Sequence, residues 1–203
     1  IHSNLPTKLQ KLQYSSNIID QYEICHFCQF ESRIVPDGLS KNYPKNIRFD
    51  LLPNRINKFL SQLLEIVNKN RKSTFWDSAL DVYNKAGHNG ARKPTSVMAR
   101  FQKFLPGYYG SKGASIILKT LISLFIDSKK LSSDMIIPLK PLDYLAEVLV
   151  PETAIRLIAE DQNIKLDEAK NVMEDSVDFG LYVHDVEDDD IEVLVNEIIP
   201  KSL

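Results

Sequence analysis

The segment LPGYYGSKG, residues 105–113, contains three of the chain's seven glycines, each three residues from the next. A glycine-rich loop that opens a helix can bind a phosphate group, because the first backbone N–H groups of a helix have no partner within it. The spacing here matches neither G-x-x-x-x-G-K-[ST] nor G-x-G-x-x-G, and the preceding segment has the apolar period of a helix. We therefore interpret the segment as a helix end, a tight turn and a new helix start. The turn consists of Pro106, Gly107, Tyr109, Gly110 and Gly113.

The alternative is that the helix start after this turn binds an anion with the help of nearby cations. The turn lies in a basic stretch, residues 85–119, and no acidic residue occurs between Asp81 and Asp127. Lysine and arginine mixed with aromatic residues suit a surface that follows a phosphate backbone and stacks bases. The predicted partner- or anion-binding residues are Arg92, Lys93, Arg100, Lys103, Tyr108 and Lys112.

Other properties of the basic stretch favour a protein partner. The isoelectric point of the whole chain is about 6.1, well below that of a typical nucleic-acid-binding domain. Phe101 and Phe104 have the spacing of helical core residues, and the basic face could contact the acidic end of the same chain. We expect a protein partner, and binding of DNA or RNA through the same residues is the alternative.

Two cysteines, Cys25 and Cys28, form a C-x-x-C pair that could be half of a zinc site. A structural zinc ion needs four ligands, usually two such pairs, and the four histidines do not supply a second pair. We expect two buried cysteines that act as small apolar residues and no bound metal. So few cysteines also favour a reducing compartment over a disulfide-built secreted fold.

The acidic run Asp185–Asp190 does not have the order of a calcium-binding loop. We interpret it as a solvated acidic turn, and attraction of a basic partner such as a histone or ribosomal tail is the alternative. No nucleophile with a base and an orienting group is recognisable, so we expect no enzymatic activity. Glu152 and Asp161 are interpreted as a first-turn dipole partner and an exposed helix charge, and His184 as a residue at a strand edge.

The composition is that of one globular domain, with 43% hydrophobic and 26% charged residues. Residues 1–142 hold 21 lysines and arginines against 10 acidic residues, whereas residues 143–203 hold 4 against 17. Such asymmetry favours partners of opposite charge or docking of one half on the other. No apolar run is long enough to span a membrane, there is no secretory signal peptide, and no cofactor or small-molecule substrate is indicated. Since the chain begins with Ile1, we expect it to be a piece of a longer protein.

The apolar pattern predicts a mostly helical chain. Residues 5–22 are predicted as a helical lead-in, and Val35-Pro36-Asp37-Gly38 as a turn. A continuous apolar face predicts a helix from Leu51 to Val67, with Pro53 in its first turn. Further helices are predicted from Ser73 or Thr74 to Gly87, 94–105, 113–128, 142–150 and 151–159, and one capped by Asp167 and ended by Gly180.

The period then changes to that of short strands at Leu181–Val183 and Ile191–Val195. The fold class predicted from these patterns is α+β: a mostly α-helical single domain with a minor antiparallel β element. Its limits are residues 23–203, preceded by a lead-in at residues 1–22.

Three motifs in this order resemble the conserved C-terminal domain of the fungal restriction of telomere capping protein 4. They are C-x-x-C-x-x-E-x-x-IVPDG-x-x-x-x-YP-x-NI-x-F at residues 25–49, LPGYYGSKG at 105–113 and VLVPETAIRLIAED at 148–161. The resemblance implies a protein of the nucleus and cytoplasm that is tied to telomere capping. It implies no enzymatic activity and no cofactor. We therefore expect a non-catalytic interaction module.

Overall fold

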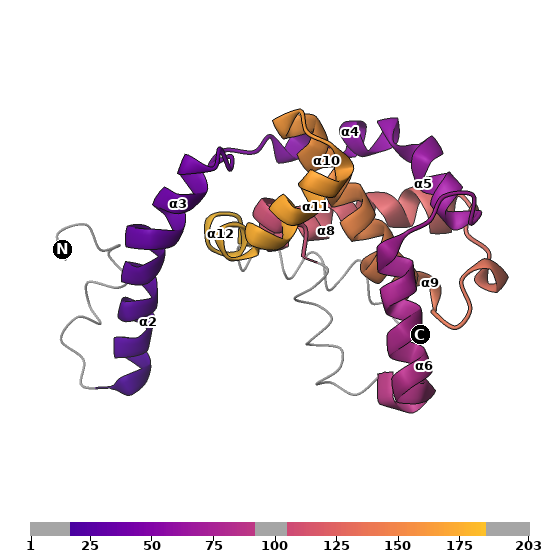
Figure 1. The fold of residues 1–203 in the computed structure, drawn as a ribbon, viewed down its shortest axis with the longest axis horizontal. Helices are drawn as coiled ribbons and strands as arrows, with labels where there is room; N and C mark the ends of the chain where they lie inside the picture. Colours follow the sequence, from indigo (N-terminus) through magenta and orange to yellow (C-terminus); the bar gives the residue numbers. More distant parts are fainter. Residues whose placement is uncertain (1–16, 92–104, 186–203) are drawn as a thin grey trace, which may run out of the picture. The chain divides into compact units, whose positions relative to one another are not determined.

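A computed structural model describes residues 17–91 and 105–185 of the chain (Figure 1). The chain divides into two compact units, Ile1–Pro44 and Lys45–Leu203, whereas the sequence prediction separated residues 1–22 from 23–203. In the first unit, α2 (Ile18–Gln29), the π-helical turn η1 (Phe30–Ile34) and α3 (Val35–Ser40) follow one another without a break. The turn predicted at Val35–Gly38 is therefore wrong. Pro36 lies in the first turn of α3, directly after the π-helical turn η1.

The second unit is built from helices and short helical turns. In its first part these are η2 (Phe49–Leu51), α4 (Leu52–Lys58), α5 (Leu60–Val67) and α6 (Thr74–Ala91). Its second part begins with η3 (Gly107–Tyr109), α8 (Gly110–Leu121), η4 (Ile122–Asp127) and η5 (Ser133–Met135). It ends with α9 (Pro141–Tyr144), η6 (Leu145–Leu149), α10 (Val150–Gln162), α11 (Leu166–Asp175) and α12 (Val177–Val183).

Several predicted helix starts are confirmed. Pro53 and Pro151 lie in the first turns of α4 and α10. Ser73 precedes α6, and its Oγ accepts a hydrogen bond from the Trp76 backbone N–H at 3.2 Å, as expected of an N-cap. The prediction that Asp167 caps α11 is wrong, because Lys165 is the N-cap residue and Glu168 accepts its backbone N–H.

The prediction of a β element is wrong for the part of it that the structure describes. Leu181–Val183 belongs to α12, and no strand occurs between residues 17 and 91 or between 105 and 185. Three apolar residues are too few to show a helical period. In the structure they continue the helix that contains the buried residues Phe179 and Gly180. The second predicted strand, Ile191–Val195, lies outside the described residues. The described chain is thus all α-helical.

The helix ends predicted at two glycines are also wrong. Gly87 lies inside α6, which continues to Ala91; a flexible basic loop from Gly87 to Lys93, also expected from the sequence, is therefore wrong for residues 87–91. Gly180 lies inside α12, where its lack of a side chain serves packing. The helix predicted at 94–105 falls almost entirely outside the described residues. The long helix predicted from Leu51 to Val67 is present but is interrupted at Phe59.

The core of the second unit forms where α10 packs against α4, α8 and α11. The segment 113–128 is apolar nearly all round and was expected at the centre of the core, whereas only one side of α8 and η4 is fully buried. The last described helix meets the glycine turn here, because α12 packs on η3 and α8. This arrangement brings the glycine turn next to the end of the described chain. The fully buried side chains include Leu52, Ile56, Leu63, Ile117, Leu121, Phe125, Val148, Leu157 and Phe179.

Candidate functional site

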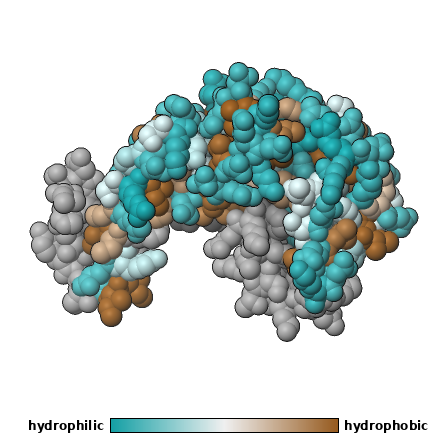
Figure 2. Space-filling model, in the orientation of Figure 1, coloured by the Kyte–Doolittle hydropathy of each residue, from teal (hydrophilic) through white to brown (hydrophobic). Residues whose placement is uncertain are grey.

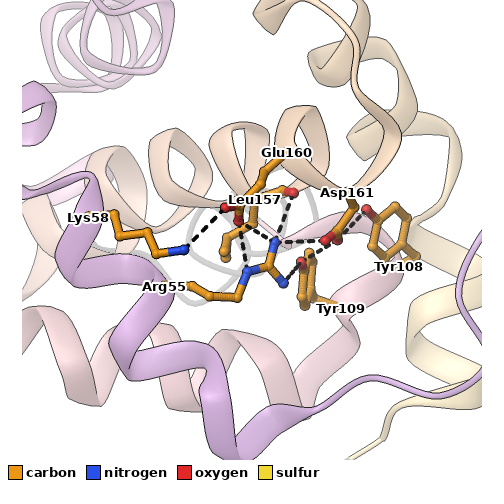
Figure 3. A network of polar contacts seen from close by, with 7 residues as sticks. All are labelled: Arg55, Lys58, Tyr108, Tyr109, Leu157, Glu160 and Asp161. Carbon is orange, nitrogen blue, oxygen red and sulfur yellow. Dashed lines mark hydrogen bonds and ion pairs between the residues drawn. The ribbon is translucent and has the colours of Figure 1, made fainter.

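A network of polar side chains joins α4, η3 and the end of α10, and Asp161 is at its centre (Figure 3). The hydroxyl of Tyr108 donates a hydrogen bond to Asp161 Oδ2 at 2.8 Å, and the hydroxyl of Tyr109 donates to the same oxygen at 2.5 Å. Arg55 Nη2 donates to Asp161 Oδ1 at 2.7 Å. Both carboxylate oxygens of Asp161 are therefore engaged by residues that lie far away in the sequence.

Arg55 uses its guanidinium to connect α4 with two turns of α10. Its Nε donates to Glu160 Oε2 at 2.8 Å, and its Nη2 lies 3.4 Å from the carbonyl oxygen of Leu157. Its Nη1 also donates to the hydroxyl of Tyr109 at 3.2 Å. Lys58 adds an ion pair with Glu160 at 3.6 Å. A planar, permanently charged guanidinium with several fixed donors suits such a role better than an ammonium group.

The environment of these groups keeps the tyrosines neutral and the arginine charged. Burial raises the pKa of Tyr108, and Tyr109 and Asp161 beside it raise it further. Burial likewise raises the pKa of Tyr109, with Asp161 as the next cause. For Arg55, burial lowers the pKa, but Tyr109, Glu160 and Asp161 together raise it above its usual value. Two neutral donors and one cation therefore hold Asp161 in place.

Asp161 is an exposed charge on a helix, as predicted, but the interpretation missed its contacts. Its side chain is 26% exposed and accepts hydrogen bonds from three residues. Sequence patterns could not reveal this, because the partners come from α4 and η3. The feature of the sequence that could have indicated the network was the adjacent pair Tyr108 and Tyr109. Their rings stack with centroids 5.0 Å apart.

Glu152 was interpreted as a first-turn dipole partner, and it does lie in the first turn of α10. It is also buried, with 5% of the residue exposed, and forms an ion pair with Arg156 at 2.6 Å. Arg156 Nε donates in addition to Gln62 Oε1 at 3.1 Å. This pair fixes α10 to α5. Its burial leaves both charges with protein partners and little contact with water.

The glycine turn is packed tightly against α11 and α12. Gly107 and Gly110 have φ of +60° and +64°, which residues with a side chain adopt rarely. A Cβ on Gly180 would lie 2.1 Å from the carbonyl oxygen of Gly107. The Tyr108 N–H donates to Ser176 Oγ at 2.9 Å, and the Lys112 N–H donates to the carbonyl oxygen of His184 at 3.1 Å. These backbone donors are thus used within the protein.

The structure describes only some of the predicted contact residues. Tyr108 is fully buried, so its side chain is not on the surface of the described chain. Lys112 is partly exposed in the first turn of α8. Four of the six residues, Arg92, Lys93, Arg100 and Lys103, lie outside the described residues. Binding of a partner or an anion by this set stays a prediction.

The residues considered for metal binding and catalysis do not form a cluster in the described chain. Cys25 on α2 is exposed and Cys28 is partly exposed, so the prediction that both are buried is wrong. His184 is buried at the end of α12, where its ring lies edge-on to Phe49 with centroids 5.4 Å apart. It is not at a strand edge. Asp185 accepts a hydrogen bond from Ser111, and the rest of the acidic run lies outside the described residues.

In the part of the chain that the structure describes, no group of three or more histidine, cysteine, aspartate and glutamate side chains is arranged to hold a metal ion. No helix within residues 17–91 and 105–185 combines the length and the apolar character that crossing a membrane requires.

The outer face of α11 is acidic. Every carboxylate on it is exposed, and Lys170 of the same helix contacts Thr74 of α6. Within the described chain, no ion pair with lysine or arginine neutralises these groups. Figure 2 shows a mainly hydrophilic surface over α10 and α11. The residues of this acidic face are Asp167, Glu168, Asn171, Glu174 and Asp175.

The start of α6 lies beside α11 and presents aromatic rings to ammonium groups of the chain itself. Lys170 Nζ of α11 lies 3.3 Å from Thr74 Oγ1 and 5.6 Å from the ring centroid of Phe75. Lys69 Nζ lies 3.4 Å from the ring centroid of Trp76. Distances below about 6 Å are typical of cation–π attraction. The acidic face of α11 and the start of α6 together form what we call the cation-binding surface.

Comparison with known proteins identifies the family. In the described residues the fold is all-helical, and the glycine turn packs closely against α11 and α12. The model of the RTC4-like domain matches residues 68–185. This chain belongs to the RTC4-like domain family, which confirms the resemblance seen in the motifs at 105–113 and 148–161; the motif at 25–49 lies outside the match. Searches of curated proteins and of solved structures return no match.

Proposed function

We propose that this domain is a non-catalytic interaction module that binds a basic segment of a protein partner. The observation that carries the proposal is the cation-binding surface. Four carboxylates on one helix face have no cationic partner in the described chain, and aromatic rings beside them already hold two ammonium groups. Carboxylates and aromatic faces are complementary to lysine and arginine side chains. A lysine-rich segment such as a histone tail has the chemistry to bind there.

The polar network supports an interaction role over a catalytic one. The buried charged residues Glu152 and Arg156 pair with each other, and the partly buried Arg55 and Asp161 do the same. These contacts fix α4, η3 and α10 relative to one another. A fixed helical body presents the face of α11 without reorganisation, which favours binding.

Family membership supports a connection with telomere capping and a location in the nucleus and cytoplasm, both of which the resemblance implies. Expression of the full-length protein with a fluorescent tag would test the location. Loss of the capping effect on neutralising the acidic face of α11, at unchanged protein level, would support the connection. A capping effect that survives the neutralisation would contradict it.

Binding of DNA or RNA through the basic stretch at residues 85–119 is the second candidate. It is favoured by the absence of acidic residues between Asp81 and Asp127. The acidic face of α11 would repel a phosphate backbone, so any such contact must lie away from it. Phosphate contacts also lose affinity steeply with salt.

Fluorescence anisotropy with a labelled lysine-rich peptide, and separately with labelled DNA, distinguishes the two functions. We expect the peptide to bind, and we expect the variant with Asp167→Asn, Glu168→Gln, Glu174→Gln and Asp175→Asn to bind it at least about tenfold more weakly. A matched control neutralises Asp50 and Asp81, whose carboxylates pair with Arg48 and Lys85, and it should bind the peptide as the wild type does. Tighter, strongly salt-dependent binding of DNA, with loss on Arg92→Glu and Lys93→Glu, would contradict the proposal.

A further inference from the structure

Three side chains at the edge of the cation-binding surface form a small aromatic site. The rings of Trp76 and Tyr144 are perpendicular neighbours, with centroids 5.3 Å apart and an interplanar angle of 69°. The ammonium group of Lys69 lies against both, 3.4 Å from the centroid of Trp76 and 5.3 Å from that of Tyr144. Two rings at an angle therefore surround one cation.

The backbone at the end of α5 does not require a lysine at position 69. Lys69 follows α5 with φ of +61°, a conformation in which glycine or asparagine is common and other residues are strained. Burial lowers the pKa of Lys69, because part of its side chain is removed from water. The backbone needs no ammonium group here, and the aromatic rings are what the side chain contacts.

The walls of the site are well fixed, whereas its occupant is attached to an exposed turn. Tyr144 is fully buried and Trp76 is half-buried, but the turn that carries Lys69 is exposed. The Tyr144 hydroxyl has no hydrogen-bond partner within the described chain. An aromatic ring carries partial negative charge on its face, so the faces of Trp76 and Tyr144 attract the ammonium group of Lys69 without a carboxylate partner.

We propose that Trp76 and Tyr144 form a binding site for a methylated ammonium group, and that Lys69 occupies this site in the absence of a partner. Methylation removes the N–H donors of an ammonium group and weakens its hydration, so a methylated lysine gains more from aromatic faces than an unmodified one. The inference rests on the proposed function, since the methylated lysine belongs to the basic segment that binds the acidic face of α11. Lys170 connects the two parts by its contact with Thr74 at the start of α6.

The chain contains one tryptophan, so its fluorescence reports on this site directly. Two synthetic peptides of identical lysine-rich sequence, one with a single trimethyllysine and one with unmodified lysine, serve as probes. We expect the methylated peptide to bind at least about fivefold more tightly and to change the Trp76 emission. Lys69→Gly removes the internal cation, suits the backbone conformation and should increase the affinity for the methylated peptide by a further factor of about five.

A matched control is available in Lys129→Gly. Lys129 is also an exposed lysine with a positive φ, 55°, at the end of a helical segment, but no aromatic ring contact involves its ammonium group in the described chain. This variant should bind both peptides as the wild type does. Trp76→Ala should abolish the preference for the methylated peptide, and Tyr144→Phe, which keeps the ring, should retain it.

The outcomes separate this inference from the function on which it rests. Equal affinity of the two peptides for the wild type and for Lys69→Gly would overturn the aromatic site and leave the binding of basic segments intact. No binding of either peptide to a folded protein would overturn both. An equal gain in affinity from Lys69→Gly and Lys129→Gly would assign the effect to general charge and overturn the site.

Discussion

At the scale of single residues, Asp161 determines how the parts of the domain are held together. Its carboxylate accepts hydrogen bonds from Arg55, Tyr108 and Tyr109, which come from two other segments of the chain. Folding brings the hydroxyls and the guanidinium at least partly out of water, and each would lose one hydrogen-bond partner if the carboxylate were removed. The cost of such a loss exceeds that of an ordinary surface ion pair.

Asp161→Ala should therefore lower the free energy of unfolding by about 2–4 kcal/mol, after allowance for partial exposure of the side chain. The change is measured by urea denaturation followed by circular dichroism. Asp81→Ala removes a carboxylate that pairs with Lys85 at 2.7 Å on the exposed side of α6, and it should cost less than about 0.5 kcal/mol. Equal losses for the two variants would contradict the central position of Asp161.

The tyrosines make a second prediction at this scale, because folding raises the pKa of Tyr108 and Tyr109. The unfolded chain loses these protons above about pH 10, whereas the folded chain keeps them. The stability that they contribute is fully present below that pH and is lost as the pH rises above it. Each tyrosine contributes a loss of about 1.4 kcal/mol per pH unit.

Denaturation at about pH 8, pH 10 and pH 11 measures this dependence. The double variant Tyr108→Phe, Tyr109→Phe should be less stable at the lowest of these values but should lose stability less steeply with pH. Tyr144, whose pKa is also raised by burial, still titrates in this variant and leaves a shallower slope. An identical dependence of the unfolding free energy on pH in the two proteins would show that burial and Asp161 do not raise the pKa of Tyr108 and Tyr109.

At the scale of the elements, the glycine turn and α12 pack closely because glycines without side chains lie at their contact. Gly107, Gly110 and Gly180 approach one another so closely that an added Cβ on Gly180 would meet backbone atoms of the turn. Backbone atoms cannot yield as the end of a flexible side chain can. The three glycines therefore serve packing between η3, α8 and α12.

Gly180→Ala is predicted to reverse the usual effect of this substitution. Within a helix, Gly→Ala ordinarily increases stability by about 0.5–1 kcal/mol. Here the added methyl group would lie 2.1 Å from the carbonyl oxygen of Gly107, and we expect a loss of more than about 3 kcal/mol. Asn171→Ala on the exposed side of α11 is the control and should change stability by less than about 1 kcal/mol. A stabilised Gly180→Ala protein would contradict the packing of the turn.

How far the sequence could predict these elements depends on where the relevant contacts lie. Pro53, Pro151 and Ser73 act through the first turn of their own helices, so local rules placed them correctly. Gly180 was predicted to end a helix because its partners, Gly107 and Gly110, are distant in sequence. The strand predicted at Leu181–Val183 was wrong for a related reason, since a three-residue apolar run carries too little periodicity to distinguish strand from helix.

At the scale of the whole molecule, the unequal distribution of charge was visible in the sequence, but its arrangement was not. The sequence predicted a basic contact surface from Arg92 to Lys112, of which the structure describes little. The acidic face of α11 could have been found from the spacing of Asp167, Glu168, Glu174 and Asp175. The aromatic site could not, because Lys69, Trp76 and Tyr144 belong to separate segments.

The central claim is that the cation-binding surface recognises a basic protein segment. The most direct test is a titration of the isotope-labelled chain with an unlabelled lysine-rich peptide, followed by the backbone amide and indole signals in NMR spectra. The account predicts that shifts gather on residues 167–175 and on the Trp76 indole, and that neutralising the acidic face removes them. Absence of shifts there, with shifts around Lys112 on addition of DNA, would contradict it.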